Sequence, residues 1–117
     1  MREAIRDKGR LEHIHNAIMT IVDYVQDKTK AQIFSDVMVY HGIVKYIEII
    51  GEASYMLTKD FRQNHSDTPW EIITKMRHVL VHDYYQISQE EVWNVILYDL
   101  PLLKTQIEQY LQEFDEK

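Results

Sequence analysis

Apolar residues recur every three or four positions over most of the chain, which is the period of an amphipathic helix rather than of a strand. The first of these stripes predicts a helix from about Arg6 to Asp27. The segment that follows it, QDKTKAQIF, is polar and shows no helical period, so we expect a connection there. The apolar members of the first stripe are Leu11, Ile14, Ile18, Ile21, Val22 and Val25.

A second stripe begins after Ser35 and Asp36, either of which can cap a helix by accepting its first amide hydrogens. It is the longest helix that we expect in the chain, and Gly51 within it favours a close helix crossing rather than a break. Its members are Tyr40, Ile43, Val44, Ile47, Ile50, Ser54 and Leu57.

A third helix is predicted after the segment Arg62 to Asp67, which reads RQNHSD and indicates a solvated connection. Thr68 at the N-cap, Pro69 at the first helical position and Glu71 at the third form the pattern of a capping box with the favoured first-turn proline. We therefore expect this helix to begin at Pro69.

A fourth helix is predicted to begin near Ser88, which repeats the capping-box pattern with Glu91. Pro101 lies inside its apolar stripe, where a proline removes one helical hydrogen bond and crowds the preceding turn. We therefore expect a kink near Leu97. The stripe consists of Val92, Ile96, Leu100, Leu103, Ile107 and Leu111.

Four amphipathic helices joined by short connections indicate an all-α fold, a four-helix up-down bundle whose last helix is kinked. The composition agrees, because three Gly and two Pro are few for a fold built on hairpins and tight turns. With 117 residues and 45% hydrophobic content, the chain suits a single domain spanning residues 1–117, without an internal repeat or a linker.

Composition disfavours several classes of function. The absence of cysteine excludes a thiolate nucleophile, a disulfide framework and a cysteine zinc site. No apolar stretch approaches the ~20 residues that span a bilayer, and the first residues lack a signal region, so we expect a cytoplasmic protein without a membrane partner. Thirteen Lys and Arg against nineteen Asp and Glu give a net charge of −6, so any contact with RNA should be local.

The segment from Arg77 to Tyr85 differs from ordinary helix core. It gathers chemically active side chains within nine residues: Arg77, His78, His82, Asp83, Tyr84 and Tyr85. Arg77 lies on the same predicted helix face as Trp70, where a guanidinium group needs a partner. For an isolated arginine, the simplest interpretation is an ion pair with a carboxylate, for which the candidates are Glu48, Glu52 and Asp83.

The same segment also allows chemistry. His78 and His82 stand four residues apart, but HVLVH lacks the Glu of an HExxH helix and no third ligand is evident, so we expect neither a metal nor a cofactor. An Arg, a His that exchanges protons near neutral pH and a Tyr hydroxyl suit phosphoryl chemistry on a nucleic acid. In RNA cleavage, His82 could take the proton of the ribose 2′-hydroxyl or protonate the leaving oxygen, while Arg77 neutralises the phosphorane. A purely structural cluster is the alternative.

Helix geometry sets a condition on this interpretation. Positions 77 and 82 of a continuous helix lie about 140° apart around its axis. The side chains of Arg77 and His82 therefore converge only if the helix ends there or a second subunit contributes one of them.

The residues from Arg77 to Tyr84, RHVLVHDY, resemble the RxxxxHxY motif of the HepT-like branch of the HEPN ribonuclease toxins. The resemblance covers nearly the whole chain. It includes RLEHIHNAI near the start, IEIIGEAS in the second predicted helix, PW at the start of the third and LYDLPLLKTQI in the fourth.

This resemblance implies a metal-independent endoribonuclease of a type VII HepT/MntA-like toxin-antitoxin system, active as a homodimer on RNA and not on DNA. Arg77 and His82 would be catalytic, with His78 and Asp83 in support. The partner would be a cognate MNT-type nucleotidyltransferase antitoxin, which silences the toxin by transferring AMP to the motif tyrosine, Tyr84. Added phosphate and adenosine beside Arg77 would occupy its donors and exclude a phosphodiester.

The chain departs from the family pattern at His78, where the family commonly has Asn. The adjacent Tyr85 also leaves open which of two hydroxyls accepts AMP. Two other functions stay open at the level of sequence: a non-catalytic subunit that presents substrates or nucleotides to the nucleotidyltransferase, and a helical dimer whose motif is structural. The net negative charge favours the first of these over unaided RNA capture.

Overall fold

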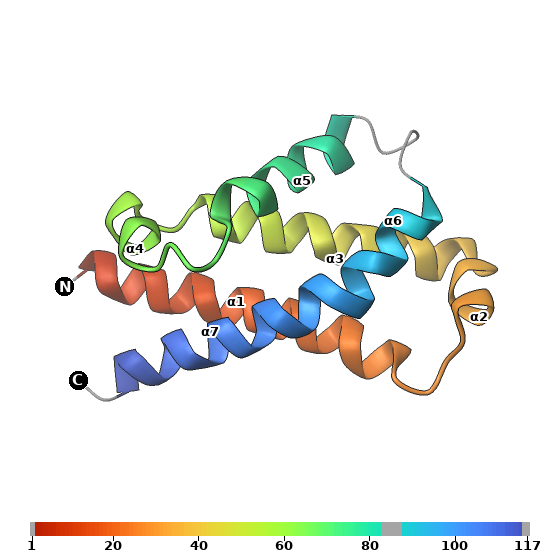
Figure 1. Cartoon of the computed structure of the whole chain (residues 1–117), viewed down its shortest axis with the longest axis horizontal. Helices are drawn as coiled ribbons and strands as arrows, with labels where there is room; N and C mark the ends of the chain where they lie inside the picture. Colours follow the sequence, from red (N-terminus) through yellow and green to blue (C-terminus); the bar gives the residue numbers. More distant parts are fainter. Residues whose placement is uncertain (1, 83–87, 116–117) are drawn as a thin grey trace.

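Four long helical segments run alternately up and down the molecule in the computed structural model, which describes residues 2–82 and 88–115 (Figure 1). The side chains of residues 2–4 and 80–82 are outside this description. No strand occurs in the described ranges, so the predicted all-α bundle is confirmed. The long segments are α1 (Arg2–Val25), α3 (Val37–Tyr55), α5 (Trp70–His82) and a composite of α6 (Gln89–Asn94), η2 (Val95–Asp99) and α7 (Leu100–Asp115).

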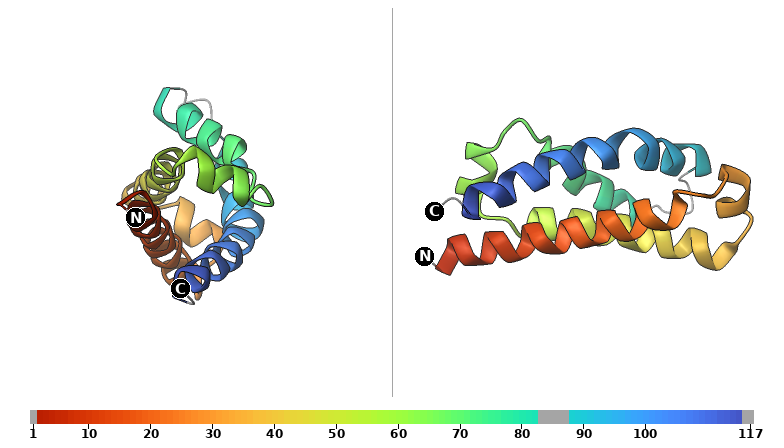
Figure 2. Two further views of the ribbon diagram at one scale, coloured as in Figure 1. Left: turned by 90° about the vertical axis from the view of Figure 1, so that its left-hand side faces the viewer. Right: turned by 90° about the horizontal axis from the view of Figure 1, so that it is seen from below.

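The predicted apolar stripes form the core. The side chains of Ile14, Ile18, Ile50 and Ile107 are completely buried, and Leu100 joins them at the turn of the last segment. The helices pack in a chain of neighbours, because α5 lies on α3, α3 on α1, and α1 on α7 (Figure 2). Burial of these stripes is the main driving force for the bundle.

Two expected connections contain short helices instead. α2 (Lys30–Phe34) lies within the segment predicted to be irregular, where Thr29 and Gln32 form a capping box and Ile33 is completely buried. α4 (Lys59–Asn64) extends into the predicted solvated connection and buries Phe61. Each helix is too short to show a helical period in the sequence. Its only sequence signals are one buried apolar residue and one capping residue.

The relative lengths of the helices were also predicted wrongly. α1 is the longest helix, with 24 residues against 19 in α3. It begins earlier than Arg6 because the polar residues at the start of the chain add helical turns that no apolar stripe marks. Asp36 caps α3, as one of the two alternatives predicted, and accepts hydrogen bonds from the amides of Met38 and Val39.

The start of α5 differs in detail from the predicted capping box. α5 begins at Trp70 rather than at Pro69. The hydroxyl of Thr68 does not cap this helix, because it lies 2.6 Å from the hydroxyl of Tyr110 and 2.9 Å from Oε1 of Gln106 on α7. Thr68 is buried, so its hydroxyl needs partners, and α7 supplies them.

The last segment contains the predicted irregularity. Ser88 caps α6 by accepting a hydrogen bond from the amide of Glu91. The five residues of η2, centred on Leu97, then form a π-helical turn that ends just before Pro101. A π turn is one way for a helix to absorb a proline that cannot donate a hydrogen bond to the preceding turn.

Candidate active site

Close contact between α3 and α5 positions the motif arginine. Gly51 of α3 faces Arg77 of α5, and a Cβ atom added at Gly51 would lie 2.3 Å from the Cβ of Arg77. The predicted close crossing at this glycine is therefore confirmed. Trp70 anchors the start of α5, because its ring is buried and its Nε1 donates a hydrogen bond to the carbonyl of His65. Arg77 follows two turns later on the same helix.

The guanidinium group of Arg77 pairs with Glu52 of α3. Nε of Arg77 lies 3.1 Å, and Nη2 lies 3.0 Å, from the same carboxylate oxygen, Oε2. This is the ion pair that the simplest interpretation of Arg77 predicted. The Arg77 side chain is still 33% exposed, so the group is held from one side and open to solvent on the other.

The other predicted site residues are only partly described. His78 follows Arg77 on α5 and is exposed. His82 is the last residue of α5, and its side chain is outside the described part of the molecule. Asp83, Tyr84 and Tyr85 lie outside the described residues. The roles assigned to His78, His82, Asp83 and Tyr84 stay predictions, and so does the choice between Tyr84 and Tyr85 as the acceptor of AMP.

The described residues contain neither a candidate metal site nor a candidate membrane span. No group of three or more His, Cys, Asp and Glu side chains is arranged to hold a metal ion within residues 2–82 and 88–115. In the same ranges, no helix combines the length and apolar character needed to cross a membrane.

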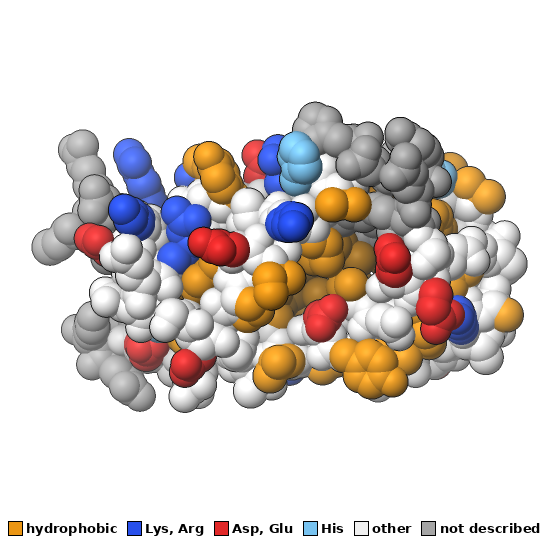
Figure 3. Space-filling model, turned by 45° about the horizontal axis from the view of Figure 1, so that its top comes forward, with side chains coloured by type: hydrophobic (Ala, Val, Ile, Leu, Met, Phe, Trp, Pro, Cys, Tyr) orange, Lys and Arg blue, Asp and Glu red, His pale blue; other side chains and the backbone are white. Residues whose placement is uncertain are grey.

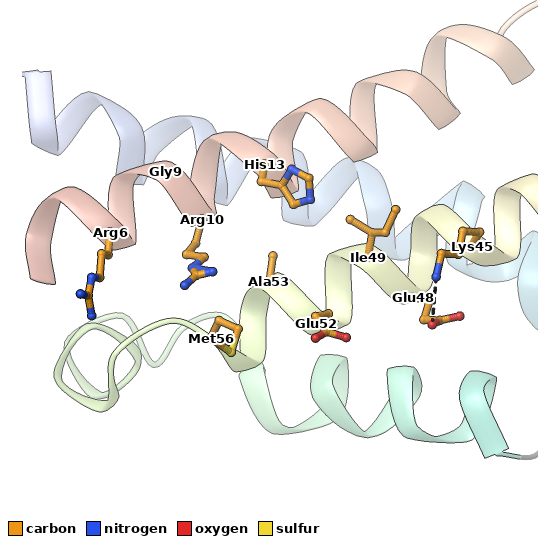
Figure 4. Close-up of a pocket in the computed structure, with 10 residues that line it drawn as sticks. All are labelled: Arg6, Gly9, Arg10, His13, Lys45, Glu48, Ile49, Glu52, Ala53 and Met56. Atoms are coloured by element: carbon orange, nitrogen blue, oxygen red, sulfur yellow. Dashed lines mark hydrogen bonds and ion pairs between the residues drawn. The ribbon is translucent and has the colours of Figure 1, made fainter.

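A groove next to the Arg77–Glu52 pair was missed at the level of sequence. It has a volume of about 690 Å³ between α1 and α3, and Figure 4 shows the side chains that line it. Arg6, Arg10 and His13 extend into it from α1, and Glu52 stands at its border with α5. The i, i+4, i+7 spacing of the three α1 residues marks one helix face and could have revealed them.

Two histidines outside the motif join α7 to the rest of the bundle. His15 of α1 lies 2.9 Å from Glu108, and His65 lies 3.1 Å from Glu113. Hydrogen bonds from His15 and then Lys104 hold the pKa of the Glu108 carboxyl below its usual range. These pairs stabilise the packing of α7, and none of their residues belongs to the motif.

Comparisons with known proteins identify the family. A family model described as "Ribonuclease HepT-like" matches residues 14–110. No solved structure matches the chain. A protein of Thermococcus cleftensis named "Probable ribonuclease HepT" is 31% identical over 86% of this chain and 92% of its own length.

Two further relatives carry the words "putative RNase" in their names. That of Caldanaerobacter subterraneus subsp. tengcongensis is 34% identical over 88% of this chain and 92% of its own length. That of Methanocaldococcus jannaschii, also named as a gamma-glutamylcyclotransferase, is 33% identical over 91% of this chain. The chain spans only 48% of that longer protein. On the family match and these relatives, the chain belongs to the ribonuclease HepT-like family.

Proposed function

We propose that this chain is a metal-independent endoribonuclease toxin that cleaves RNA through Arg77 and His82 of an RxxxxHxY motif. The observation that carries the proposal is the partly exposed side chain of Arg77, the first residue of that motif, which Glu52 of α3 holds in an ion pair. The family match and the names of the relatives support RNA as the substrate. We place the chain in a type VII HepT/MntA-like toxin-antitoxin system, in the cytoplasm.

Arg77 keeps free donors for a phosphate while Glu52 holds it. A guanidinium has five N–H donors, and the contact with Oε2 of Glu52 uses one from Nε and one from Nη2. The remaining N–H groups can reach a phosphodiester oxygen from the solvent side. Because charge builds on these oxygens as phosphorus becomes five-coordinate, a fixed cation there stabilises the transition state more than the ground state.

The reaction needs no co-reactant. The ribose 2′-oxygen forms a bond to phosphorus, the bond from phosphorus to the 5′-oxygen breaks, and the products are a 2′,3′-cyclic phosphate and a 5′-hydroxyl. His82 takes the proton of the 2′-hydroxyl or protonates the departing 5′-oxygen, which are the two proton transfers that a general base and acid provide. His78 and Asp83 support the site by hydrogen bonding.

We further propose that the active site is shared between two copies of the chain. α5 continues as a regular helix through position 82, so positions 77 and 82 lie about 140° apart around its axis. A second copy related by twofold symmetry can bring its own motif against Arg77. Hydrophobic side chains surround a hollow on the face that presents α5 and α7, which supports an apolar interface (Figure 3). The exposed large apolar residues of α5, η2 and α7 are Ile72, Leu97, Tyr98 and Leu102.

Mixing two inactive variants tests both parts of this proposal. Arg77→Ala and His82→Ala should each abolish cleavage of a labelled RNA. If one site takes Arg77 from one copy and His82 from the other, a mixed dimer contains one intact site. Random exchange should then restore about a quarter of the wild-type activity, because about half of the dimers are mixed and each has one working site of two.

The outcomes of the mixing experiment separate the claims. No cleavage by the wild-type protein would overturn the ribonuclease proposal and favour the non-catalytic subunit, which the net charge of −6 also fits. Cleavage by the wild type without any recovery on mixing would overturn the shared site. Light scattering on the wild-type protein provides the control, since a monomer at micromolar concentration excludes a homodimeric enzyme.

Control by a cognate MNT-type nucleotidyltransferase is the last part of the proposal. The phenolic oxygen of Tyr84 would attack the α-phosphorus of ATP, pyrophosphate would leave, and the phenolic proton would pass to a base or water. Tyr84→Phe keeps the ring and removes the acceptor oxygen, so it should escape silencing. Intact-mass measurement after incubation with the partner and ATP reads each AMP directly. An unchanged adduct on Tyr84→Phe would move the acceptor to Tyr85 or another residue.

A further inference from the structure

The groove between α1 and α3 is positively charged in a chain whose net charge is negative. Two carboxylates line it, but both have cationic partners: Glu48 lies 3.4 Å from Lys45, and Glu52 pairs with Arg77. The remaining charged side chains of the lining are Arg6 and Arg10. Among the described residues, neither of these arginines has an ion pair. The groove therefore has about two uncompensated positive charges, whereas the whole chain has a charge of −6.

The arginines form a row rather than a random pair. Arg6, Arg10 and His13 occupy positions i, i+4 and i+7 of α1, which share one helix face. Figure 4 shows Arg10 extending from α1 toward the end of α3 and Arg6 toward the segment that follows it, with His13 next along α1. The row rises about 10 Å along the helix axis, at 1.5 Å per residue, so it can meet more than one phosphate of an extended strand.

A buried carboxylate fixes this row relative to α3. Asp7, beside Arg6 on α1, is only 4% exposed. Its two oxygens accept hydrogen bonds from the amide of Thr58 at 2.9 Å and from its hydroxyl at 2.7 Å. Thr58 caps α4 directly after the end of α3. This contact ties α1 to the segment that follows α3, and it therefore fixes the position of the arginine row relative to the end of α3.

The floor of the groove lacks a platform for bases. Its apolar residues are Ile49, Ala53 and Met56, and among the described lining residues none is Phe, Tyr or Trp, so that the imidazole of His13 on the α1 wall is the one ring there. Single-stranded nucleic acids are read by stacking on aromatic side chains, whereas charged rows bind the backbone without regard to sequence. At one edge, Glu52 connects the groove to the guanidinium of Arg77.

We propose that the α1–α3 groove binds the phosphate backbone of single-stranded RNA, with Arg6 and Arg10 as phosphate ligands, and leads the strand to Arg77. The inference rests on the proposed ribonuclease function but adds a binding site outside its motif. It explains how an acidic protein holds RNA, because the contact is confined to one positive groove.

Binding and cleavage are measured separately. The binding probe is a fluorescein-labelled single-stranded RNA with 2′-O-methyl riboses, which cannot be cleaved through the 2′-oxygen. Its anisotropy gives Kd for the full chain at several salt concentrations. Each phosphate contact to a single strand contributes about 0.7 to the slope of log K against log salt, so Arg6→Gln with Arg10→Gln should lower the slope by about 1.4. Between about 50 and 200 mM salt, the wild type should lose roughly sevenfold more affinity than this variant.

A matched control removes the same charge elsewhere. Lys28→Gln with Lys30→Gln also lowers the charge by two, and both lysines lie at the opposite end of α1, beyond Val25. This control should leave Kd and the salt slope at their wild-type values. If the two double variants lose RNA affinity equally, the effect comes from overall charge and the proposed groove is wrong.

A second variant leaves both arginines in place. Gly9 lies in the groove between them, and a Cβ added there meets no atom within 4 Å. Gly9→Glu should therefore fold and repel the backbone, raising Kd at low salt by about tenfold or more. Gly42→Glu is its control, because Gly42 is also helical with open space at its Cβ but lies outside this groove. Unchanged binding by Gly9→Glu would overturn the proposal.

Cleavage of unmodified RNA completes the test. Because Arg6 and Arg10 lie away from the scissile phosphate, their substitution should raise KM and leave kcat close to the wild-type value, whereas Arg77→Gln should lower kcat. If the wild type cleaves RNA but the groove variants change neither Kd nor KM, the proposed RNA-binding groove is wrong and the ribonuclease proposal is retained. If the groove variants weaken RNA binding but the wild type does not cleave RNA, the RNA-binding groove is supported and the ribonuclease proposal is wrong. If the groove variants lose binding to the nucleotidyltransferase but still bind RNA, the groove is a binding surface for the antitoxin and the inference is overturned.

Discussion

The contact between Gly51 and Arg77 allows a quantitative test of how α5 is held. In Gly51→Ala, the new methyl carbon would lie 2.3 Å from Cβ of Arg77 and 3.1 Å from the carbonyl oxygen of Ile73. Carbon atoms normally stay about 3.5 Å apart or more, so the helices must separate by roughly 1.2 Å at this point. Cβ of Arg77 cannot rotate away, because it is attached directly to the helix backbone.

Two opposing free energies decide the result. Alanine stabilises a helix by about 1 kcal/mol relative to glycine. Forced separation of packed helices typically costs 1–3 kcal/mol, and we take about 3 kcal/mol because the clash involves a Cβ atom. The net loss is then about 2 kcal/mol in the free energy of unfolding. For a chain of this size, the melting temperature should fall by roughly 6–12 °C.

Gly42→Ala is the matched control for this measurement. Gly42 lies in the same helix, α3, and a Cβ added there has no atom within 4 Å. The helix preference of alanine should therefore raise its melting temperature by a few degrees, for a gain of about 0.5–1 kcal/mol. Far-ultraviolet circular dichroism on heating measures both variants. If Gly51→Ala is stabilised as much as Gly42→Ala, the close crossing described above is wrong.

The same variant has a consequence for chemistry. A displacement of about 1 Å in a catalytic group can reduce the rate about 10²-fold. Gly51→Ala should therefore cleave RNA at about one hundredth of the wild-type rate at temperatures where it is still folded. Normal cleavage would show that Arg77 tolerates the shift and does not need this fixed position.

Three further predictions concern metal ions, acid stability and the anchor of α1. Cleavage should survive EDTA, and loss of activity that added metal restores would contradict the proton-transfer mechanism. Glu108→Gln should weaken the dependence of the melting temperature on pH below about 4.5. The pKa of Glu108 in the folded chain lies below that value, so the ionised carboxylate stabilises the fold above pH 4.5 and this stabilisation is lost as the pH falls. Asp7→Asn should lower the free energy of unfolding in urea by about 1.5–3 kcal/mol, because it weakens two charge-assisted hydrogen bonds to Thr58, and an unchanged value would mean that Asp7 does not anchor α1.

The sequence predicted the long helices because burial follows their period. Residues such as Ile14, Ile47 and Ile107 are spaced for one face, and they are buried as a result. The close crossing at Gly51 could also be predicted, because a glycine within a strong helical pattern usually has a packing reason. The short helices α2 and α4 could not be found in this way, since fewer than two turns contain no period.

Side-chain partners were less predictable than helices. Thr68 matched a capping-box pattern, but its hydroxyl instead meets Tyr110, which lies far along the chain on α7. The residues next to Thr68 in the sequence do not indicate that Tyr110 is its partner. For Arg77, the sequence offered three carboxylates, and only the packing of α5 on α3 selected Glu52. Long-range contacts of this kind depend on how helices cross, which a one-dimensional pattern does not contain.

Glu52 connects the two proposed parts of the RNA site. One of its carboxylate oxygens holds Arg77, and the residue also lines the groove that contains Arg6 and Arg10. A lone carboxylate in that place would repel a phosphate backbone, and the ion pair with Arg77 offsets this repulsion. The charge of Glu52 is therefore compatible with RNA only while Arg77 is its partner. Substitution of Arg77 should for that reason weaken binding to the groove as well as catalysis, whereas substitution of Arg6 and Arg10 should affect binding alone.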